Sequence, residues 1–144
     1  MLVSNILKQK ADDGVVTIAP GAAVSDAAKI LSDRKIGSVV VSSDNKTALG
    51  ILSERDIVRE IGQRGSVCLS ETVESMMTSK LVTCVSSDRA DNILATMTEG
   101  RFRHMPVVEN GEMIGLITLG DVVKARLSEL AMEKDALEGM IMGH

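Results

Sequence analysis

Two aspartates, Asp56 and Asp121, each end a seven-residue motif, and the two motifs are near copies of each other. Residues 50–56 read Gly-Ile-Leu-Ser-Glu-Arg-Asp, and residues 115–121 read Gly-Leu-Ile-Thr-Leu-Gly-Asp. Each contains a glycine, two aliphatic residues, a hydroxyl residue, two variable positions and the aspartate. An ionised carboxylate only accepts hydrogen bonds, so it suits donors such as the hydroxyl groups of ribose.

The spacing of the hydroxyl residue and the aspartate also has a purely structural explanation. Ser53-x-x-Asp56 and Thr118-x-x-Asp121 match the capping box, in which the two side chains bond to backbone amides at the start of a helix. A strand-to-helix turn also presents free amides and a positive dipole end, where an anion can bind. The aspartates would repel a phosphate there, so a phosphate needs cations from elsewhere. The sequence therefore leaves two roles open for these residues, a helix cap and a ribose-binding site.

A basic cluster supplies such cations. Arg101, Arg103 and His104 stand directly before Pro106, and Arg55 lies within the first motif. Charged donors form strong hydrogen bonds with phosphate oxygens. Proline cannot donate to a strand ladder, which places it at a strand start or edge, where a ligand could approach the backbone. The alternatives are an ordinary solvated charge group and a simple edge strand.

The similarity extends beyond the two motifs and identifies an internal repeat of about 65 residues. The aligned segments are 16–18 with 82–84, 37–41 with 103–107, and 3–7 with 73–77. Each unit is predicted to run strand, helix, strand, strand, helix. In a chain of 144 residues, each half would bury too little surface alone, so we expect the halves to share one core.

Apolar residues recur at helical spacing in both units and predict one buried face on the first helix of each. These residues are Val24, Ala27, Ala28 and Leu31 in the first unit, and Ala90, Ile93, Leu94 and Met97 in the second. The expected strands are 16–18, 38–42 and 49–52, then 105–108 and 113–117, with a tight hairpin at Asn110-Gly111.

The last helix of each unit is expected to begin at the motif. Its apolar face comprises Ile57, Val58 and Ile61 in the first unit, and Val122, Val123, Leu127 and Leu130 in the second. The stripe then continues through Met132, Leu137, Met140 and Ile141, along a terminal helix that neither unit needs. We expect three parts: a first repeat with its lead-in helix (1–66), a second repeat (67–128) and a helical extension (129–144).

Composition narrows the function. The net charge is −4 and Phe102 is the only aromatic residue, which disfavours nucleic-acid binding, because that binding uses aromatic platforms or a basic face. No apolar run approaches the roughly 18 residues of a membrane span, and no signal segment begins the chain. Cys68 and Cys84 fit no metal or redox spacing. We therefore expect a cytoplasmic protein without membrane association, metal ligands or catalytic residues, with Cys84 buried.

Together these residues resemble the CBS domain family over about residues 1–128. The resemblance rests on both motifs, on Arg-His-Met-Pro-Val-Val at 103–108 and on Val-Thr-x-x-Pro at 16–20. It implies an α+β fold in which tandem β-α-β-β-α repeats form one pseudo-two-fold module, a Bateman module, here with a C-terminal helical extension. Such modules have two clefts that commonly bind adenosine compounds such as AMP, ATP, NAD or S-adenosylmethionine.

The resemblance also implies roles for individual residues. The aspartates would hold ribose hydroxyls, the hydroxyl residues would contact ribose or phosphate, and Arg103 and His104 would meet phosphate. The resulting ligand-binding set is Ser53, Arg55, Asp56, Arg101, Arg103, His104, Met105, Pro106, Thr118 and Asp121.

The first repeat departs from this pattern. Gly37 and Ser38 stand in the places of Arg103 and His104, and Val40 stands in that of the proline. We therefore expect unequal clefts, with the second-repeat residues forming the better phosphate site and the first cleft holding a nucleoside end or nothing.

The function expected from the sequence is a stand-alone regulatory module that binds AMP or ATP, or next NAD(H), as an energy or redox sensor. It is expected to have no catalytic activity. The alternatives are a scaffold with empty clefts and an enzyme. Because paired modules of this family commonly associate through their helical faces, we also expect a homodimer, and a regulated protein partner is a further possibility.

Overall fold

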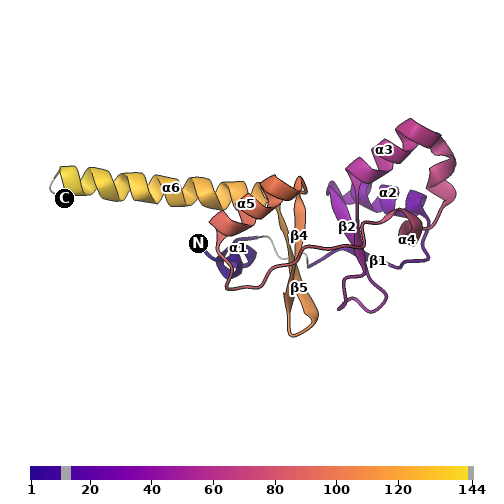
Figure 1. Ribbon diagram of the computed structural model, residues 1–144, viewed down its shortest axis with the longest axis horizontal. Helices are drawn as coiled ribbons and strands as arrows, with labels where there is room; N and C mark the ends of the chain where they lie inside the picture. Colours follow the sequence, from indigo (N-terminus) through magenta and orange to yellow (C-terminus); the bar gives the residue numbers. More distant parts are fainter. Residues whose placement is uncertain (11–13, 143–144) are drawn as a thin grey trace.

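The computed structural model describes residues 1–10 and 14–142 and shows two α/β units side by side (Figure 1). The first contains β1 (Thr17–Ile18), α2 (Val24–Arg34), β2 (Ser38–Val41), β3 (Gly50–Ser53) and α3 (Glu54–Arg64). The second contains α5 (Ala90–Gly100), β4 (His104–Glu109), β5 (Glu112–Thr118) and α6 (Leu119–Ile141). The lead-in helix α1 (Val3–Gln9) precedes the first unit, and the 3₁₀ turn η1 (Ser66–Ser70) and α4 (Val73–Met76) precede the second.

The two lead-in helices are exchanged between the units. Val3 and Ile6 of α1 are buried in the core of the second unit, whereas Val73 of α4 is buried in the core of the first. Matching backbone hydrogen bonds hold both: Val3 donates to Asp88 O (2.9 Å), and Val73 donates to Ala22 O (2.8 Å). The expectation of one shared core is therefore wrong, because each unit has its own core and the other half of the chain completes it.

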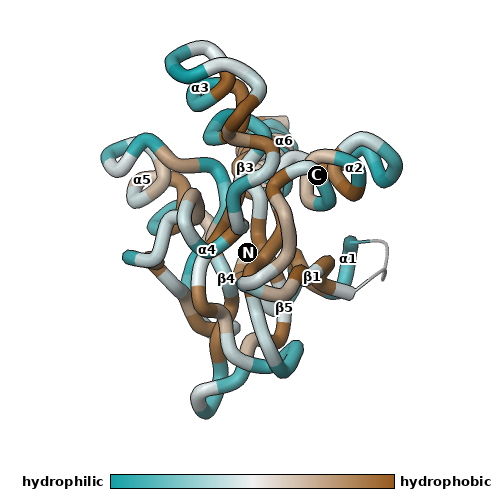
Figure 2. Tube along the Cα trace, turned by 90° about the vertical axis from the view of Figure 1, so that its right-hand side faces the viewer, coloured by the Kyte–Doolittle hydropathy of each residue, from teal (hydrophilic) through white to brown (hydrophobic). Residues whose placement is uncertain are grey.

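The buried faces of the first helices agree with the sequence pattern. Val24, Ala27 and Leu31 of α2 are buried, as are Ala90, Ile93 and Met97 of α5. Figure 2 shows the hydrophobic segments gathered along the strands and hydrophilic ones at the outer turns of α2 and α3. The faces expected on α3 and α6 are largely unburied: Ile57 and Val122 are covered, but Val58 and Leu127 are 68% and 64% exposed.

The strands follow the repeat with one difference. In the first unit β2 lies between parallel β1 and antiparallel β3, and the Val40 amide donates to Val16 O at 3.0 Å. Pro106 occupies the matching position in β4 and has no amide hydrogen. The strand expected at 82–84 is accordingly reduced to a single bridge between Cys84 and Val107. Pro106 lies inside β4 and not at its start, but β4 is an outer strand of a two-stranded sheet, which agrees with the edge position that was the alternative.

The hairpin and the terminal helix can also be compared with the expectations from the sequence. Asn110 and Gly111 have φ angles of 52° and 79°, so both adopt the left-handed conformation that a two-residue hairpin of this kind requires. The extension at 129–144 does not form a helix of its own. It continues α6, which runs unbroken to Ile141 and projects away from the second unit (Figure 1).

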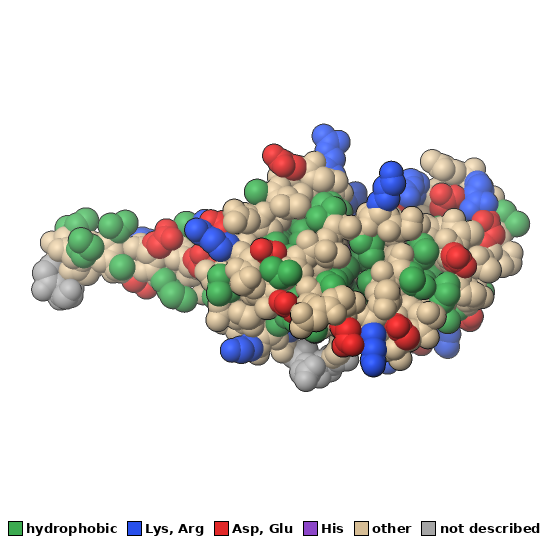
Figure 3. All heavy atoms as spheres, turned by 60° about the horizontal axis from the view of Figure 1, so that its bottom comes forward, with side chains coloured by type: hydrophobic (Ala, Val, Ile, Leu, Met, Phe, Trp, Pro, Cys, Tyr) green, Lys and Arg blue, Asp and Glu red, His purple; other side chains and the backbone are tan. Residues whose placement is uncertain are grey.

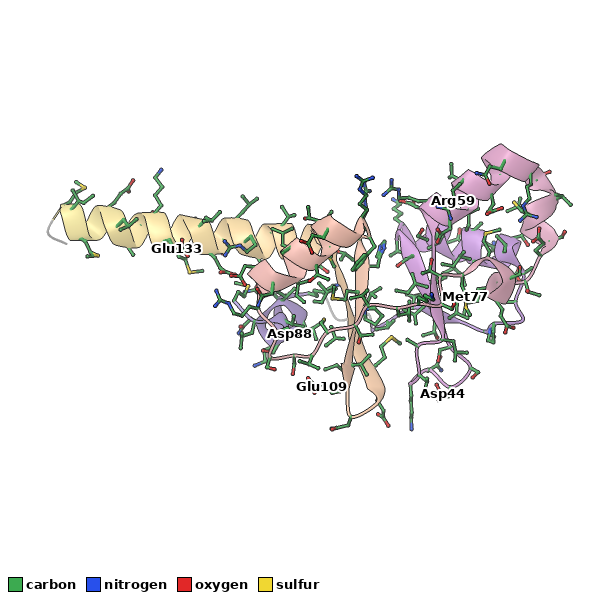
Figure 4. The ribbon with its side chains drawn as sticks, in the orientation of Figure 1. Asp44, Arg59, Met77, Asp88, Glu109 and Glu133 are labelled. Atoms are coloured by element: carbon green, nitrogen blue, oxygen red, sulfur yellow. The ribbon has the colours of Figure 1, made fainter. Side chains whose placement is uncertain are left out.

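The motif glycines allow the exchanged segments to lie against the strands. A Cβ on Gly50 would come within 2.8 Å of Met77 Cγ and 2.9 Å of the Thr78 carbonyl oxygen. Met77, labelled in Figure 4, directly follows α4. In the other unit a Cβ on Gly115 would come within 2.7 Å of Leu7 Cδ2. The first motif therefore needs glycine where the lead-in backbone crosses its strand, whereas at Gly115 a shift of the Leu7 side chain could admit a methyl group.

Gly50→Ala is expected to lower the free energy of unfolding by about 1–3 kcal/mol, because the Thr78 backbone must move to admit the methyl group. Gly21→Ala is the control, since nothing lies within 4 Å of a Cβ there, and it should change stability by less than about 0.5 kcal/mol. Urea denaturation measures both. Equal stability of the two variants would contradict the close-packing explanation.

Candidate functional site

A cavity of about 670 Å³ lies between the two units, and we call it cavity 1. Its walls come from the start of α3, from the linker after α4 and from the turn between α5 and β4. The lining residues are Gly37, Ile51, Ser53, Glu54, Arg55, Asp56, Arg59, Thr78, Lys80, Leu81, Val82, Gly100, Arg101, Phe102, Arg103 and His104. Cavity 1 therefore combines the first motif with the basic cluster of the second repeat.

A smaller cavity of about 220 Å³, cavity 2, lies on the other side of His104. It combines the first part of the second motif with segments of the first repeat and the residue that follows α1. The lining residues are Leu7, Lys10, Gly14, Val15, Val16, Ile36, Gly37, Ser38, His104, Ile114, Gly115, Leu116 and Thr118. His104 and Gly37 belong to both linings, so these two residues separate the cavities.

The predicted assignment of one cleft to each repeat is wrong. Thr118 lies in cavity 2 with Gly37 and Ser38, whereas Arg103 lies in cavity 1 with Ser53. The reason is the packing of the units. A Cβ on Gly37 would lie 3.3 Å from His104 Nε2, so the start of β2 meets the start of β4, and each strand start faces the helix start of the other unit.

Three predicted binding residues lie outside both cavities. Met105 is fully buried in the core of the second unit, and Pro106 is buried inside β4. Asp121 belongs to neither lining, and its carboxylate instead holds the Lys10 ammonium group, with Nζ and Oδ2 2.8 Å apart. The remaining seven line a cavity: Ser53, Arg55, Asp56, Arg101, Arg103 and His104 in cavity 1, and Thr118 and again His104 in cavity 2.

Both motifs form the capping box that their spacing predicts. The Ser53 hydroxyl accepts from the Asp56 amide at 3.2 Å, and the Ser53 amide donates to Asp56 Oδ2 at 3.0 Å. Thr118 and Asp121 repeat this pair of bonds at 3.1 and 3.0 Å. The cap therefore engages only one carboxylate oxygen of each aspartate. The second oxygen of Asp56, Oδ1, accepts from Arg59 Nη2 at 3.0 Å.

Cavity 1 carries an excess of positive charge. Five of its lining residues are cationic and two are anionic: Arg55, Arg59, Lys80, Arg101 and Arg103 against Glu54 and Asp56. His104 adds little charge, because burial lowers its pKa; Arg103 and Lys10 lower it further, and Glu54 and Asp121 only partly oppose these effects. Its neutral imidazole can donate one hydrogen bond and accept another. The cavity therefore suits an anion with neutral polar groups beside it.

Comparison with known proteins identifies the fold. Residues 3–63 and 73–128 match the family model for the CBS domain. The chain belongs to the CBS domain family. It is a CBS pair of the regulatory type, and such domains are generally non-catalytic. The tandem α+β repeats and the helical extension expected from the sequence are confirmed.

Two relatives illustrate the similarity. The mitochondrial CBS domain-containing protein CBSX3 of Arabidopsis thaliana is 32% identical over 148 aligned positions, which cover 98% of this chain and 72% of the plant protein. The CBS-domain containing protein of Agrobacterium tumefaciens is 42% identical, with a TM-score of 0.82 over 88% of this chain and 99% of that structure. Since one relative is mitochondrial, a cytoplasmic location stays a prediction.

A third relative was crystallised with a nucleotide. The structure of CBSX2 in complex with AMP is 27% identical to this CBS pair, with a TM-score of 0.72. The match covers 88% of this chain and 96% of that structure.

Several lining residues of the CBS pair escaped the sequence analysis. Arg59 lies one helical turn beyond Asp56 on α3 (Figure 4). This spacing places the two side chains on the same side of the helix and could have indicated that Arg59 also belongs to the site. Lys80 matches Lys10, because the lead-in segments align with an offset of 70 residues. Phe102, between Arg101 and Arg103, lines cavity 1 and packs against the second core.

The cysteines of the CBS pair are structural. Cys68 and Cys84 are both buried. Burial raises the pKa of Cys84 to about 12, and the nearby Asp88 and Glu109 add to the shift, so its thiol stays protonated at neutral pH. Within residues 1–10 and 14–142, no three His, Cys, Asp or Glu side chains are arranged to hold a metal ion. No helix in this part of the chain is long and apolar enough to cross a membrane.

Proposed function

We propose that this CBS pair binds an adenosine nucleotide in cavity 1 and acts as an energy or redox sensor without catalytic activity. AMP and ATP are the preferred ligands, followed by NAD(H). The observation that carries the proposal is the composition of cavity 1, which places the acceptor Asp56 and the cations Arg101 and Arg103 in one space. Its volume of about 670 Å³ lies in the range of small-molecule sites, about 300–1,000 Å³.

The first motif suits the ribose. Asp56 Oδ2 is engaged by the helix cap, but among the described residues Oδ1 bonds only to Arg59. The Arg59 side chain is 58% exposed and that of Asp56 is 13% exposed. The Arg59 guanidinium can leave this pair for solvent, and a ribose hydroxyl can then take its place at Oδ1, where the carboxylate still accepts a hydrogen bond. Arg59 is then free to turn toward the phosphate.

The second repeat and the linker suit the phosphate. Arg103 and Arg101 face the cavity from the turn before β4, and Lys80 lines it from the linker. Guanidinium groups bind phosphate oxygens in a bidentate way, and a lysine adds a point charge. This charge favours a nucleotide over a nucleoside as the ligand of cavity 1.

The rest of the cavity suits an adenine ring. Ile51, Leu81, Val82 and Phe102 supply apolar surface. The Val82 carbonyl matches that of Val16, which accepts the Val40 amide, but Pro106 has no amide hydrogen to offer. An adenine amino group is a suitable donor for this carbonyl. The AMP complex of CBSX2 supports an adenosine ligand.

A melting experiment separates the sensor from a scaffold with empty clefts, because a ligand that binds only the folded state raises the melting temperature. Adenosine, AMP, ATP, NADH and S-adenosylmethionine are titrated separately, and mass spectrometry identifies any nucleotide that co-purifies. No shift with any of them at millimolar concentration would reject the sensor. Turnover of a bound nucleotide would favour an enzyme.

Arg103→Ala is expected to weaken AMP binding by at least about tenfold and adenosine binding by less than about threefold, because it removes charge-assisted bonds to phosphate only. Ser38→Ala is the matched control, since Ser38 lines cavity 2 and its hydroxyl has no hydrogen-bond partner among the described residues. Calorimetric titration measures all four affinities. An equal loss for AMP and adenosine would place Arg103 outside the phosphate site.

Asp56→Ala is expected to weaken AMP and adenosine alike, by about 10- to 100-fold, because a ribose contact is common to both. Asp56→Asn should lose less, since the amide oxygen still accepts. The control is Asp121→Asn titrated with AMP, because Asp121 does not line cavity 1. If Asp56→Ala lowers the melting temperature and leaves both affinities unchanged, the aspartate serves only as a helix cap.

We also propose a homodimer that forms through α6. Positions along α6 at alternating spacings of four and three are apolar except for Lys134, which is close to the pattern of a coiled-coil seam. The seam positions are Val123, Leu127, Leu130, Lys134, Leu137 and Ile141. Leu137 and Ile141 are 59% and 84% exposed, and Figure 3 shows hydrophobic side chains in solvent along the projecting part of α6. An apolar surface of this kind marks an interface.

The seam fits an antiparallel copy of itself. Pairing Val123 with Ile141 also pairs Leu127 with Leu137 and Leu130 with Lys134. The same register places Lys124 beside Glu138, which bear opposite charges, and it keeps the two Lys134 side chains apart. A parallel pairing would bring these two ammonium groups together at the centre of the seam.

Replacing both Leu130 and Leu137 by Glu should convert the dimer to a monomer, because each change places a charge in the apolar seam. The control replaces Ser128 and Ala136, which are exposed on the other side of α6, by Glu and adds the same charge. Sedimentation at several concentrations measures the mass, and AMP affinity should be equal in both variants. A wild-type chain that sediments as a monomer at every concentration would refute the dimer.

A further inference from the structure

The aspartates of the two motifs hold different partners. Asp56 bonds to Arg59, which lies three residues away on the same helix. Asp121 bonds instead to Lys10, which follows α1 at the other end of the chain, with Nζ and Oδ2 2.8 Å apart. Lys10 Nζ also donates to the Leu116 carbonyl oxygen at 2.8 Å. The ammonium group is therefore held by two oxygens of the second motif.

Lys10 and Leu116 both line cavity 2. The bonded ammonium thus lies at the place that corresponds to the ribose end of cavity 1, where Asp56 is part of the lining. We propose that Lys10 is an internal ligand of cavity 2, whose ammonium group occupies Asp121 Oδ2 and the Leu116 carbonyl oxygen and thereby restricts adenosine binding to cavity 1. The inference rests on the proposed function, since it assumes that a motif aspartate binds ribose.

The ion pair is difficult for a neutral ligand to displace. Burial by itself raises the pKa of Asp121, but the bonds from Lys10 and from the Thr118 amide outweigh it, so the pKa lies below its ordinary value. The Lys10 and Asp121 side chains are only 32% and 23% exposed. A hydrogen bond between two charged groups is stronger than one from a ribose hydroxyl, and expelling the lysine would leave its ammonium group without these two acceptors.

Lys80 is the natural comparison for Lys10. The two lead-in segments align with an offset of 70 residues, and the equivalence is visible in space because Leu7 lies against Gly115 as Met77 lies against Gly50. Lys80 lines cavity 1, yet it forms none of the ion pairs that the structure records among the described residues. Lys10 thus closes cavity 2, whereas Lys80, at the equivalent position, leaves cavity 1 open.

Lys10→Met tests the inference, because methionine keeps an unbranched apolar side chain and removes the ammonium group. Calorimetric titration with adenosine should give one site per chain in the wild type and two in Lys10→Met. Adenosine is the probe because cavity 2 has no arginine in its lining to bind a phosphate. Lys80→Met is the matched control and should keep one site, with AMP bound more weakly.

The possible results separate the two proposals. One site in both wild type and Lys10→Met, or two sites in the wild type, overturns the role of Lys10 while cavity 1 still binds its ligand. A wild type without any site contradicts the proposed function. If the wild type binds no adenosine, a site that appears in Lys10→Met still supports the inference. The absence of a site in that variant overturns it. If Lys10→Met does not fold, as judged by circular dichroism, Lys10→Gln is titrated in the same way and should also gain a second site.

Discussion

The exchange of the two lead-in helices is the constraint on which the rest of the structure depends. Val3 and Ile6 complete a core whose other buried residues run from Cys84 onward, and Val73 completes the core of the first unit. Neither unit can keep its core closed if the other half of the chain leaves. The exchange therefore ties the two units together without a common core and holds the strand starts at Gly37 and His104 against each other.

This contact between the strand starts decides what each cavity contains. The two cavities combine equivalent parts of the repeats, but Arg101 and Arg103 precede β4 without basic counterparts before β2, so this pair of arginines enters only cavity 1. Duplication followed by substitution at positions such as Gly37 and Arg103 thus yields one cationic cavity and one without arginine. The two cavities differ chemically because each combines the motif of one repeat with the strand start of the other.

The fold was largely predictable from the sequence because local patterns determine it. The helical spacing of α2 and α5, the hairpin at Asn110 and Gly111 and both capping boxes are properties of residues close in sequence. The pairing of Asp56 with Arg103 in cavity 1 was not predictable in this way, since it depends on how two units pack. The ion pair of Lys10 with Asp121 joins residues more than 100 positions apart, and no spacing rule indicates it.

The unbroken course of α6 connects events at cavity 2 with the far end of the molecule. The helix begins at the Thr118 cap and continues for 23 residues, a length of about 34 Å at 1.5 Å per residue. In a rigid helix of this length, a small rotation at one end displaces the other end by several ångströms. A tilt of about 10° at the cap would displace its far end by about 6 Å, which is comparable to one helical turn. A small change where Thr118 and Asp121 hold the helix start thereby becomes a movement large enough for another molecule to detect.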